Sequence, residues 1–311
     1  MGSEMCIRDS EVSLNTGRNV LENIGDEYEP LPVTVSREGT WSISPDELAK
    51  EVDAAFVAMH GPYGEDGGVQ RDLEEIGVRY TGADSAASAL GMNKFLSLQV
   101  MGNAGLNFPA TILLHWSDWR RNPAASENNV SHRVGFPLVV KPNRSGSSVD
   151  TIIVSVPDEL SRALPELFSR HRDLIVQPYV RGREITCGVL DNGIGDSAYA
   201  LPPILIRPRN SAFFDYREKY DDEGAEEIVP APISDAWRAA VERAAIRAHN
   251  ALGLRHLSRT DMIMGEDGRL YVLETNTIPG LTKQSLLPKA AQAAGISFTE
   301  LIGRIVKAAL R

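Results

Sequence analysis

The first part of the chain alternates short apolar runs with segments whose apolar residues recur at helical spacing. Residues Ala54–Met59 are typical of a buried strand, a helix is predicted over Val69–Glu75, and a second short strand is predicted to end at Tyr80–Gly82. Further helices are predicted over Ser13–Asn23 and from Ala86 onward. Strands that alternate with helices favour a parallel sheet covered by helices.

The later part of the chain has a different pattern, in which predicted strands follow one another after short turns. Strands are predicted over Phe136–Lys141, Val149–Val156, Leu174–Tyr179 and Ile185–Leu190, with an amphipathic helix over Asp158–Ser169. This succession is typical of antiparallel pairing. The predicted fold class is therefore α/β at the start and α+β afterwards.

Two further segments are assigned from their residue types. Ser234–Gly253 is predicted to be the longest helix, because its apolar residues fall on one face and Gly253 suits a helix end. The polar stretch Arg120–Arg133 is predicted to be a surface loop.

The composition is that of a folded acidic protein. The chain has 311 residues, 42% of them hydrophobic and 24% charged, with a net charge of -10. An acidic chain lacks the basic footprint of nucleic-acid binders, and no apolar run reaches the length of a membrane span. Two cysteines are too few for a disulfide framework, and the first ten residues lack the apolar segment of a signal peptide. We therefore expect a cytoplasmic protein.

The strongest chemical signal is the segment LSRTDMIMGEDGRLYVLETNTIPG at residues 257–280, where two strand-like runs flank the turn residues Gly265–Gly268. A loop of two or four residues would place the side chains of Arg259, Asp261, Glu274 and Asn276 on one face, whereas an odd loop would not. Carboxylate and amide oxygens beside an arginine suit Mg²⁺ with phosphate. A solvated sheet face with an Arg259–Glu274 pair is the alternative.

A second signal is VVKPNRSGSSV at Val139–Val149, where a strand ends at Lys141 and a small, glycine-containing loop follows. Backbone N–H groups and a lysine in this arrangement can cradle phosphate, although the order of residues is not that of a P-loop. An ordinary hairpin loop is the alternative.

Three weaker signals are spread along the chain. In Ile175–Glu184, extended backbone could bind an adenine edge and Glu184 the ribose hydroxyls. In Met59–Gln70, His60 and several glycines follow a strand, where ligands bind in open α/β sheets. Phe213–Tyr220 mixes aromatic and charged residues, as does a loop that covers a pocket. Taken singly, the first two fit an ordinary connection better than a binding site, and the third fits one at least as well.

In their order, these motifs resemble the D-alanine–D-alanine ligase family of the ATP-grasp superfamily. The matching segments are EVSLNTG, MHGPYGEDGGVQ, GMNK, VVKPNRSGSSV, GREITCGV, FFDYREKY and SRTDMIMGEDGRLYVLETNTIPG, which together cover about residues 9–311.

This resemblance implies a substrate domain over residues 1–92 and a two-part ATP-grasp fold over 93–183 and 184–311. ATP would lie between the last two parts with Mg²⁺ or Mn²⁺, as two ions, and would drive the joining of two D-alanine molecules for peptidoglycan synthesis. A homodimer is left open, and neither nucleic acid nor membrane is expected as a partner.

The resemblance also implies roles for individual residues. The metal ligands would be Asp261, Glu274 and Asn276. The nucleotide contacts would be Lys94, Lys141, Ser148, Gln177, Val180 and Glu184. The catalytic set would be Asp9, Ser147, Tyr220, Arg259 and the backbone of Gly280. The remaining substrate contacts would be His60, Lys219, Ser285 and Leu286.

The sequence departs from the family pattern in a few places. Residues 1–10 stand where the family has an apolar strand and a glycine-rich loop, so an unfilled sheet position near Ala54–Met59 is expected. Asp9 replaces a longer glutamate, Asn93 an aspartate, and Asp150 a glycine, whose added charge could weaken closure of the phosphate loop. These departures leave two alternatives: a non-catalytic ATP-binding remnant, or a D-alanine–D-lactate ligase. In the family, a tyrosine at the position of Tyr220 accompanies dipeptide formation.

Overall fold

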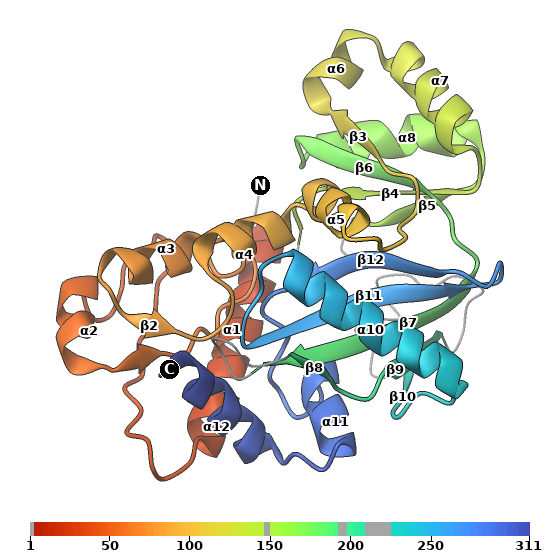
Figure 1. Ribbon diagram of the computed structural model, residues 1–311. Coiled ribbons are helices and arrows are strands. Elements are labelled where there is room, and N and C mark those ends of the chain that lie inside the picture. The colour runs from red at the N-terminus through yellow and green to blue at the C-terminus, as the bar shows by residue number, and fades with distance from the viewer. Residues whose placement is uncertain (1–2, 146–149, 192–197, 209–224) are drawn as a thin grey trace.

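The computed structural model describes residues 3–145, 150–191, 198–208 and 225–311, apart from the side chains of residues 3–10. The described strands form a two-stranded, a four-stranded and a six-stranded sheet, each with helices packed against it (Figure 1). None of the described helices is both long and apolar enough to span a membrane.

The N-terminal part contains the two-stranded sheet. Its elements are α1 (Ser3–Asn23), α2 (Pro45–Glu51), β1 (Ala54–Ala55), α3 (Gly68–Glu75), β2 (Arg79–Tyr80) and α4 (Ser85–Met92). β1 and β2 are parallel, as predicted. The predicted strand over Ala54–Met59 is shorter than expected, because the N–H of Val57 bonds to the Thr81 hydroxyl instead of a strand backbone. Within the described residues, no third strand pairs with β1 or β2.

The four-stranded sheet has the order β3-β6-β4-β5 and is antiparallel throughout. This part of the chain contains the elements α5 (Lys94–Asn103), β3 (Ile112–His115), α6 (Trp116–Arg121), α7 (Pro123–Val134), β4 (Leu138–Pro142), β5 (Ile152–Val154), α8 (Pro157–Phe168) and β6 (Asp173–Pro178). Leu138, Val140 and Val176 are buried against Leu160 and Leu164 of α8. The alternate residues of these strands therefore point to the opposite face.

The prediction of a surface loop over Arg120–Arg133 is wrong, because α6 and α7 occupy most of this segment. Asn122 ends α6 and begins α7, where its side chain accepts a hydrogen bond from the N–H of Ala125 at 3.1 Å. Pro123 follows at the first helical position, which favours helix initiation. Val130 is fully buried, so a polar segment still contributes one apolar anchor.

The six-stranded sheet has the order β10-β9-β7-β11-β12, with β8 also paired to β7. This part of the chain contains the elements β7 (Gly182–Leu190), β8 (Tyr199–Ala200), β9 (Ile204–Pro208), β10 (Ala225–Ile228), α10 (Asp235–Ala251), β11 (Leu257–Gly265), β12 (Leu270–Asn276), α11 (Leu286–Ala293) and α12 (Phe298–Ala309). The described pairs in this sheet are antiparallel, as predicted. Ser234 caps α10, but α10 has 17 residues and α1 has 21, so the prediction that it is the longest helix is wrong.

The N-terminal part packs against the C-terminal end of the chain. Val20 of α1 belongs to the same apolar cluster as Leu301 and Ile305 of α12. The guanidinium of Arg79 also donates a hydrogen bond to the carbonyl of Leu310 at 3.1 Å. These contacts hold the two-stranded sheet beside the six-stranded sheet.

Candidate active site

The central strands β7 and β11 of the six-stranded sheet have one apolar face and one polar face. Ile185, Cys187 and Val189 of β7 are buried in the cluster that includes Ala245 and Ala248 of α10. The alternate residues of β7 therefore face away from this helix. The register places Glu184 opposite Ile263, Thr186 opposite Asp261, and Gly188 opposite Arg259, so these residues share the second face.

β12 contributes two more polar residues to this face through a β-bulge. Glu274 pairs with Asp261 and Asn276 with Arg259, but Val272 pairs with Met262, which leaves Leu273 as the extra residue. The bulge turns Glu274 to the polar face while Val272 stays in the core. The predicted juxtaposition of Arg259, Asp261, Glu274 and Asn276 is confirmed.

The hairpin loop has an odd length, so the predicted loop of two or four residues is wrong. Gly265 and Arg269 are joined by a backbone hydrogen bond of 2.8 Å, and only Glu266, Asp267 and Gly268 lie between them. A regular ladder continued from this loop would have put Glu274 on the core face with Val272. The bulge at Leu273 restores the shared face.

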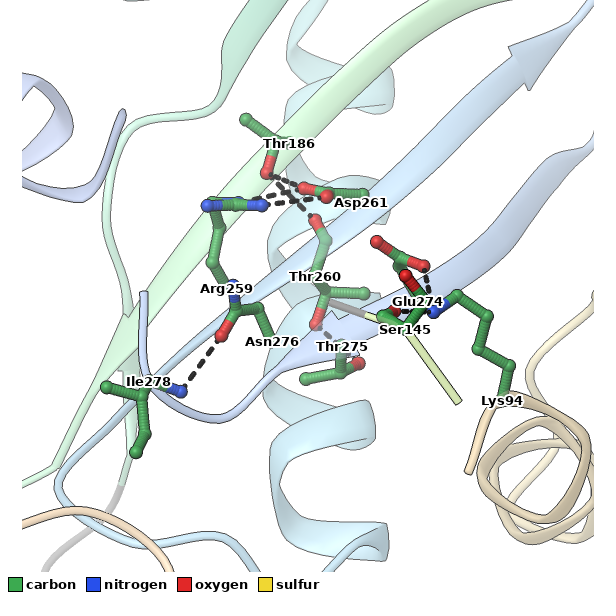
Figure 2. A network of polar contacts seen from close by, with 10 residues as sticks. All are labelled: Lys94, Ser145, Thr186, Arg259, Thr260, Asp261, Glu274, Thr275, Asn276 and Ile278. Atoms are coloured by element: carbon green, nitrogen blue, oxygen red, sulfur yellow. Dashed lines mark hydrogen bonds and ion pairs between the residues drawn. The ribbon is translucent and has the colours of Figure 1, made fainter. Parts of the chain in front are cut away.

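The Asp261 carboxylate is buried and held on both sides (Figure 2). The Arg259 Nε atom lies 2.9 Å from Oδ1 and its terminal nitrogen 2.9 Å from Oδ2 of Asp261, so the pair is bidentate. The hydroxyl of Thr186 also donates to Oδ1. Arg259 thus forms its bidentate pair with Asp261 of the same strand.

Glu274 interacts with a different cation. The Lys94 ammonium lies 3.2 Å from Glu274 Oε2 and also donates a hydrogen bond to the backbone carbonyl of Ser145 (Figure 2). Lys94 begins α5 and is buried, after Asn93, which caps the helix by accepting from Leu96 N–H at 3.1 Å. Lysine at this position thus joins the loop after β4 to the polar face of the six-stranded sheet.

A cleft opens where these segments meet. Its lining includes Glu65 of the N-terminal part, Lys94 and Ser145 beside the four-stranded sheet, and Glu274 and Asn276 of β12. Three parts of the chain therefore contribute charged or polar side chains to one cleft.

The donor set on this face fits a hard divalent cation. The described residues contain no group of three or more His, Cys, Asp or Glu side chains arranged for a metal, and the oxygen donors on this face are two carboxylates and one amide. The Asp261 carboxylate accepts from Arg259 and Thr186, and Asn276 Oδ1 accepts from the N–H of Ile278 at 2.9 Å. Oxygen ligands of this kind suit Mg²⁺, which shares its coordination with phosphates.

The candidate nucleotide residues lie on comparable sheet faces. Lys141 pairs with Ile175 and Val139 with Gln177, so these four share the face of the four-stranded sheet that points away from α8. Gln177 is buried and donates from its amide to the hydroxyl of Thr111 at 2.9 Å. Val180 is half-buried in the connection between β6 and β7, and Glu184 lies on the polar face described above. Their contacts with a nucleotide stay a prediction.

His60 is held by side chains that the sequence reasoning did not single out. Its backbone N–H donates to the Ser13 hydroxyl at 2.9 Å, and its Nε2 lies 3.0 Å from the Thr16 hydroxyl. Glu65 lies 3.8 Å from His60 Nδ1 and accepts from the N–H of Gly61 at 2.9 Å. Ser13 and Thr16 lie three residues apart on α1, so helical spacing within EVSLNTG was the available signal.

Gly280 and Ser285 lie against each other after β12. A β-carbon at Gly280 would lie 2.9 Å from the Ser285 hydroxyl, so a larger residue there would force this side chain to move. Ser285 precedes α11 at its N-terminus, and its hydroxyl accepts from the N–H of Thr282 at 3.1 Å. Leu287, next to Leu286, packs so closely on Gly188 that a β-carbon there would lie 2.5 Å from it. Because Gly188 pairs with Arg259, the start of α11 lies beside the polar face.

The remaining predicted residues fall outside the described part of the chain. These are the side chain of Asp9, together with Ser147, Ser148, Lys219 and Tyr220. Asp150 is described, and its carboxylate lies 2.6 Å from Arg170 and 2.7 Å from His171, so its charge is compensated locally. Its φ of 65° lies in the left-handed region, which explains why a glycine suits this position.

Two family models match the chain. The model described as the D-ala D-ala ligase C-terminus matches residues 100–307, and that of the D-ala D-ala ligase N-terminus matches residues 42–83. A D-alanine–D-alanine ligase from Oleidesulfovibrio alaskensis is 46% identical over 85% of this chain and 81% of its own length. A D-alanine–D-alanine ligase from Clostridium beijerinckii is 37% identical over 97% of this chain and 94% of its own length.

Solved structures give the same picture. The D-alanine–D-alanine ligase from Bacillus anthracis complexed with ATP has a TM-score of 0.80 and 33% identity, over 97% of this chain and 94% of its own. The VanG D-Ala:D-Ser ligase from Enterococcus faecalis has a TM-score of 0.84 and 29% identity, over 95% of this chain and 94% of its own. The four-stranded and six-stranded sheets are thus the two parts of an ATP-grasp fold.

Proposed function

The chain belongs to the D-alanine–D-alanine ligase family, and from this membership we propose that it uses ATP to join two D-alanine molecules into D-alanyl-D-alanine. The observation that carries the proposal is the cleft that unites Glu65, Lys94, Glu274 and Asn276 beside the Arg259–Asp261 pair. Such a cleft brings a substrate-binding segment to a phosphate- and metal-binding face. The names of the relatives support D-alanine as the substrate, and a role in bacterial cell-wall synthesis is part of the proposal.

The chemistry needs activation because a carboxylate is a poor electrophile. A carboxylate oxygen of the first D-alanine attacks the γ-phosphorus of ATP, the bond to ADP breaks, and an acyl phosphate results. The amine of the second D-alanine attacks the acyl carbon and loses a proton, giving a tetrahedral oxyanion. Its collapse breaks the bond between carbon and the phosphate oxygen and releases phosphate. Both steps concentrate negative charge, so fixed cations stabilise them.

The proposed assignment gives each described residue one task. Mg²⁺ would be held by Asp261, Glu274 and Asn276, and when bound it neutralises phosphate charge. Lys94 and Lys141 bind phosphate oxygens, and Glu184 holds the ribose. The guanidinium of Arg259, kept in place by Asp261, stabilises the oxyanion together with the backbone N–H at Gly280. A second ion and Mn²⁺ as a substitute are part of this proposal.

In this proposal, the two D-alanine molecules bind at the two ends of the cleft. The first D-alanine binds near His60, whose orientation is set by Thr16 and Glu65. Asp9, Ser147 and Tyr220 are proposed to complete that position. The carboxylate of the second D-alanine binds at Ser285 and at the backbone of Leu286, where the first N–H groups of α11 are available to an anion. Lys219 is proposed to lie near the substrates.

An assay of phosphate release tests this function. The purified chain is incubated with ATP and Mg²⁺, with and without D-alanine, and both phosphate and D-alanyl-D-alanine are measured. We expect phosphate only with D-alanine, in a one-to-one ratio with the dipeptide. Phosphate release that D-alanine does not change would contradict the proposal. D-Lactate and D-serine as competing acceptors test the choice of the second substrate.

A further inference from the structure

The short connection between α10 and β11 forms hydrogen bonds with both backbone groups of Gly82, a residue of the N-terminal part. The N–H of Gly82 donates to His256 Nδ1 at 3.0 Å, and the carbonyl of Gly82 accepts from Arg255 Nε at 2.8 Å. Arg255 also lies over the ring of Tyr80, 4.8 Å from its centroid. Accepting a hydrogen bond at Nδ1 requires a neutral imidazole with its proton on Nε2.

The backbone of His256 is unusual in a way that serves this contact. Its φ is 65°, in the left-handed region that residues other than glycine seldom adopt. The side chain is nevertheless buried, with 4% of its surface exposed. A left-handed position that carries a buried side chain with a hydrogen bond to another part of the chain indicates that the side chain itself contributes something a glycine would not.

From His256, a buried hydrogen-bond chain leads to the phosphate-binding face. The N–H of His256 donates to Asp191 Oδ1 at 2.9 Å, and Asp191 Oδ2 lies 2.9 Å from His249 Nε2. His249 Nδ1 lies 2.8 Å from the hydroxyl of Ser258, which directly precedes Arg259. Ser258, His249 and Asp191 follow the order of a catalytic triad, but Ser258 is fully buried, so this network supports structure and cannot reach a substrate.

From Gly82, a second short path leads to His60. Thr81 precedes Gly82, and its N–H donates to the carbonyl of Ala55 at 3.0 Å. Its hydroxyl accepts from the N–H of Val57 at 2.9 Å, three residues before His60. The contact at Gly82 therefore lies between the segment that carries His60 and the strand that carries Arg259.

We propose that His256 and Arg255 are positioning residues that clamp Gly82 and so fix the distance between the first D-alanine position and the phosphoryl-transfer face. This inference rests on the proposed function, because acyl-phosphate formation requires the substrate carboxylate to meet the γ-phosphate in a fixed geometry. Displacements of about 1 Å far from the chemistry can cost as much as 100-fold in rate. The clamp acts on alignment and leaves the nucleotide site itself intact.

A pair of variants at one position separates this role from a general effect on folding. His256→Gly removes the acceptor and suits a left-handed backbone, so it adds no strain. His256→Asn also tolerates that backbone and keeps an acceptor at the δ position. We expect His256→Gly to raise KM for the first D-alanine at least fivefold while the Kd for ATP, measured by calorimetry without D-alanine, stays within twofold. His256→Asn should restore at least half of the loss.

Arg255→Gln tests the other half of the clamp independently. It should likewise raise KM for the first D-alanine while the Kd for ATP stays within twofold. Arg238→Gln on α10, whose partner Asp235 is exposed, serves as the matched control and should leave both constants unchanged. An unchanged KM for D-alanine in both His256→Gly and Arg255→Gln, or equal weakening of D-alanine and ATP, would overturn the proposal.

Hydrogen exchange keeps the proposal testable if the wild-type chain proves inactive or His256→Gly folds poorly. In the wild-type chain, the amide of Gly82 should exchange slowly. It should exchange at least tenfold faster in Arg255→Gln and in folded His256→Gly, and His256→Asn should return it toward the wild-type rate. Exchange at Gly82 that none of these variants changes would refute the clamp, whereas absence of D-alanine-dependent phosphate release in the wild type would refute only the proposed function.

Discussion

Asp261 illustrates how one side chain can serve two partners at the residue scale. Its carboxylate is buried, paired in bidentate fashion with Arg259 and bonded to Thr186, and we propose it as a ligand of a cation. A buried carboxylate without a paired cation would be costly, so Arg259 stabilises the charge of Asp261. The pair therefore holds the guanidinium and the proposed metal ligand side by side.

Asp261→Asn should abolish most of the activity while leaving the fold intact. The change removes one negative charge from the metal site and weakens the hold on Arg259. We expect kcat/KM for D-alanine to fall at least 100-fold, about 2.7 kcal/mol of transition-state stabilisation. Asp267→Asn, in the exposed hairpin turn, is the control and should keep wild-type activity. Activity of Asp261→Asn within threefold of the wild type would refute the assignment.

His256 makes stability depend on pH. Burial, followed by the charge of Arg255, lowers the pKa of His256 to about 4; Asp191 acts in the opposite direction, and His249 adds to the lowering. In the unfolded chain the pKa is near 6.5, so between about pH 6.5 and 4 the unfolded state binds more protons. The free energy of unfolding therefore falls as the pH is lowered through this window, by at most about 3 kcal/mol from this group.

Urea unfolding at pH 7 and at pH 4.5 measures this loss. In His256→Asn, the decrease between the two pH values should be smaller than in the wild type, because one titrating group has been removed. The same decrease in both proteins would show that His256 does not carry the effect.

At the scale of elements, the connection between α6 and α7 provides the simplest test. Asn122 ends one helix and caps the next, with its side chain accepting from the N–H of Ala125. Asn122→Ala should lower the free energy of unfolding by about 1 kcal/mol and leave activity within twofold, since the helices lie away from the cleft. Asn128→Ala, on an exposed part of α7, is the control and should not destabilise the protein.

The same elements show which structural features the sequence could predict. Periodicity was sufficient for α8, and periodicity together with Ser234 was sufficient for α10; both helices begin within one residue of the predicted position. The pair of helices at 116–134 was missed although Asn122 and Pro123 carry a helix-start signature, because its polar composition was given more weight.

Other features depend on contacts that pattern reasoning cannot supply. An even hairpin loop and a regular ladder were both expected for β11 and β12, and neither is present. The odd loop alone would put Glu274 on the core face, and the bulge at Leu273 returns it to the predicted face. Ser13 and Thr16 meet His60 only through the packing of α1, more than 40 residues away in sequence. The clamp on Gly82 joins residues 174 positions apart and has no local signal.

At the scale of the whole molecule, three sheets converge on one cleft in a chain whose net charge is -10. Lys94 lines this cleft and Arg259 lies on the polar face of the six-stranded sheet, each paired with a carboxylate. Because salt screens exposed charges over about 10 Å, the net charge of the whole chain does not exclude an anionic ligand at this cleft. The N-terminal part contributes Glu65 to the cleft, so all three parts of the chain line it.

The measurement that tests this account most directly follows the oxygen atoms of D-alanine. The chain is incubated with ATP, Mg²⁺ and D-alanine labelled with ¹⁸O in its carboxylate, and the released phosphate is analysed by mass spectrometry. If the cleft forms an acyl phosphate, one ¹⁸O atom passes from each first D-alanine to phosphate as the dipeptide forms. Phosphate without ¹⁸O would mean that water attacked ATP, and no phosphate would mean that the chain only binds nucleotide; either result would contradict the proposed ligase.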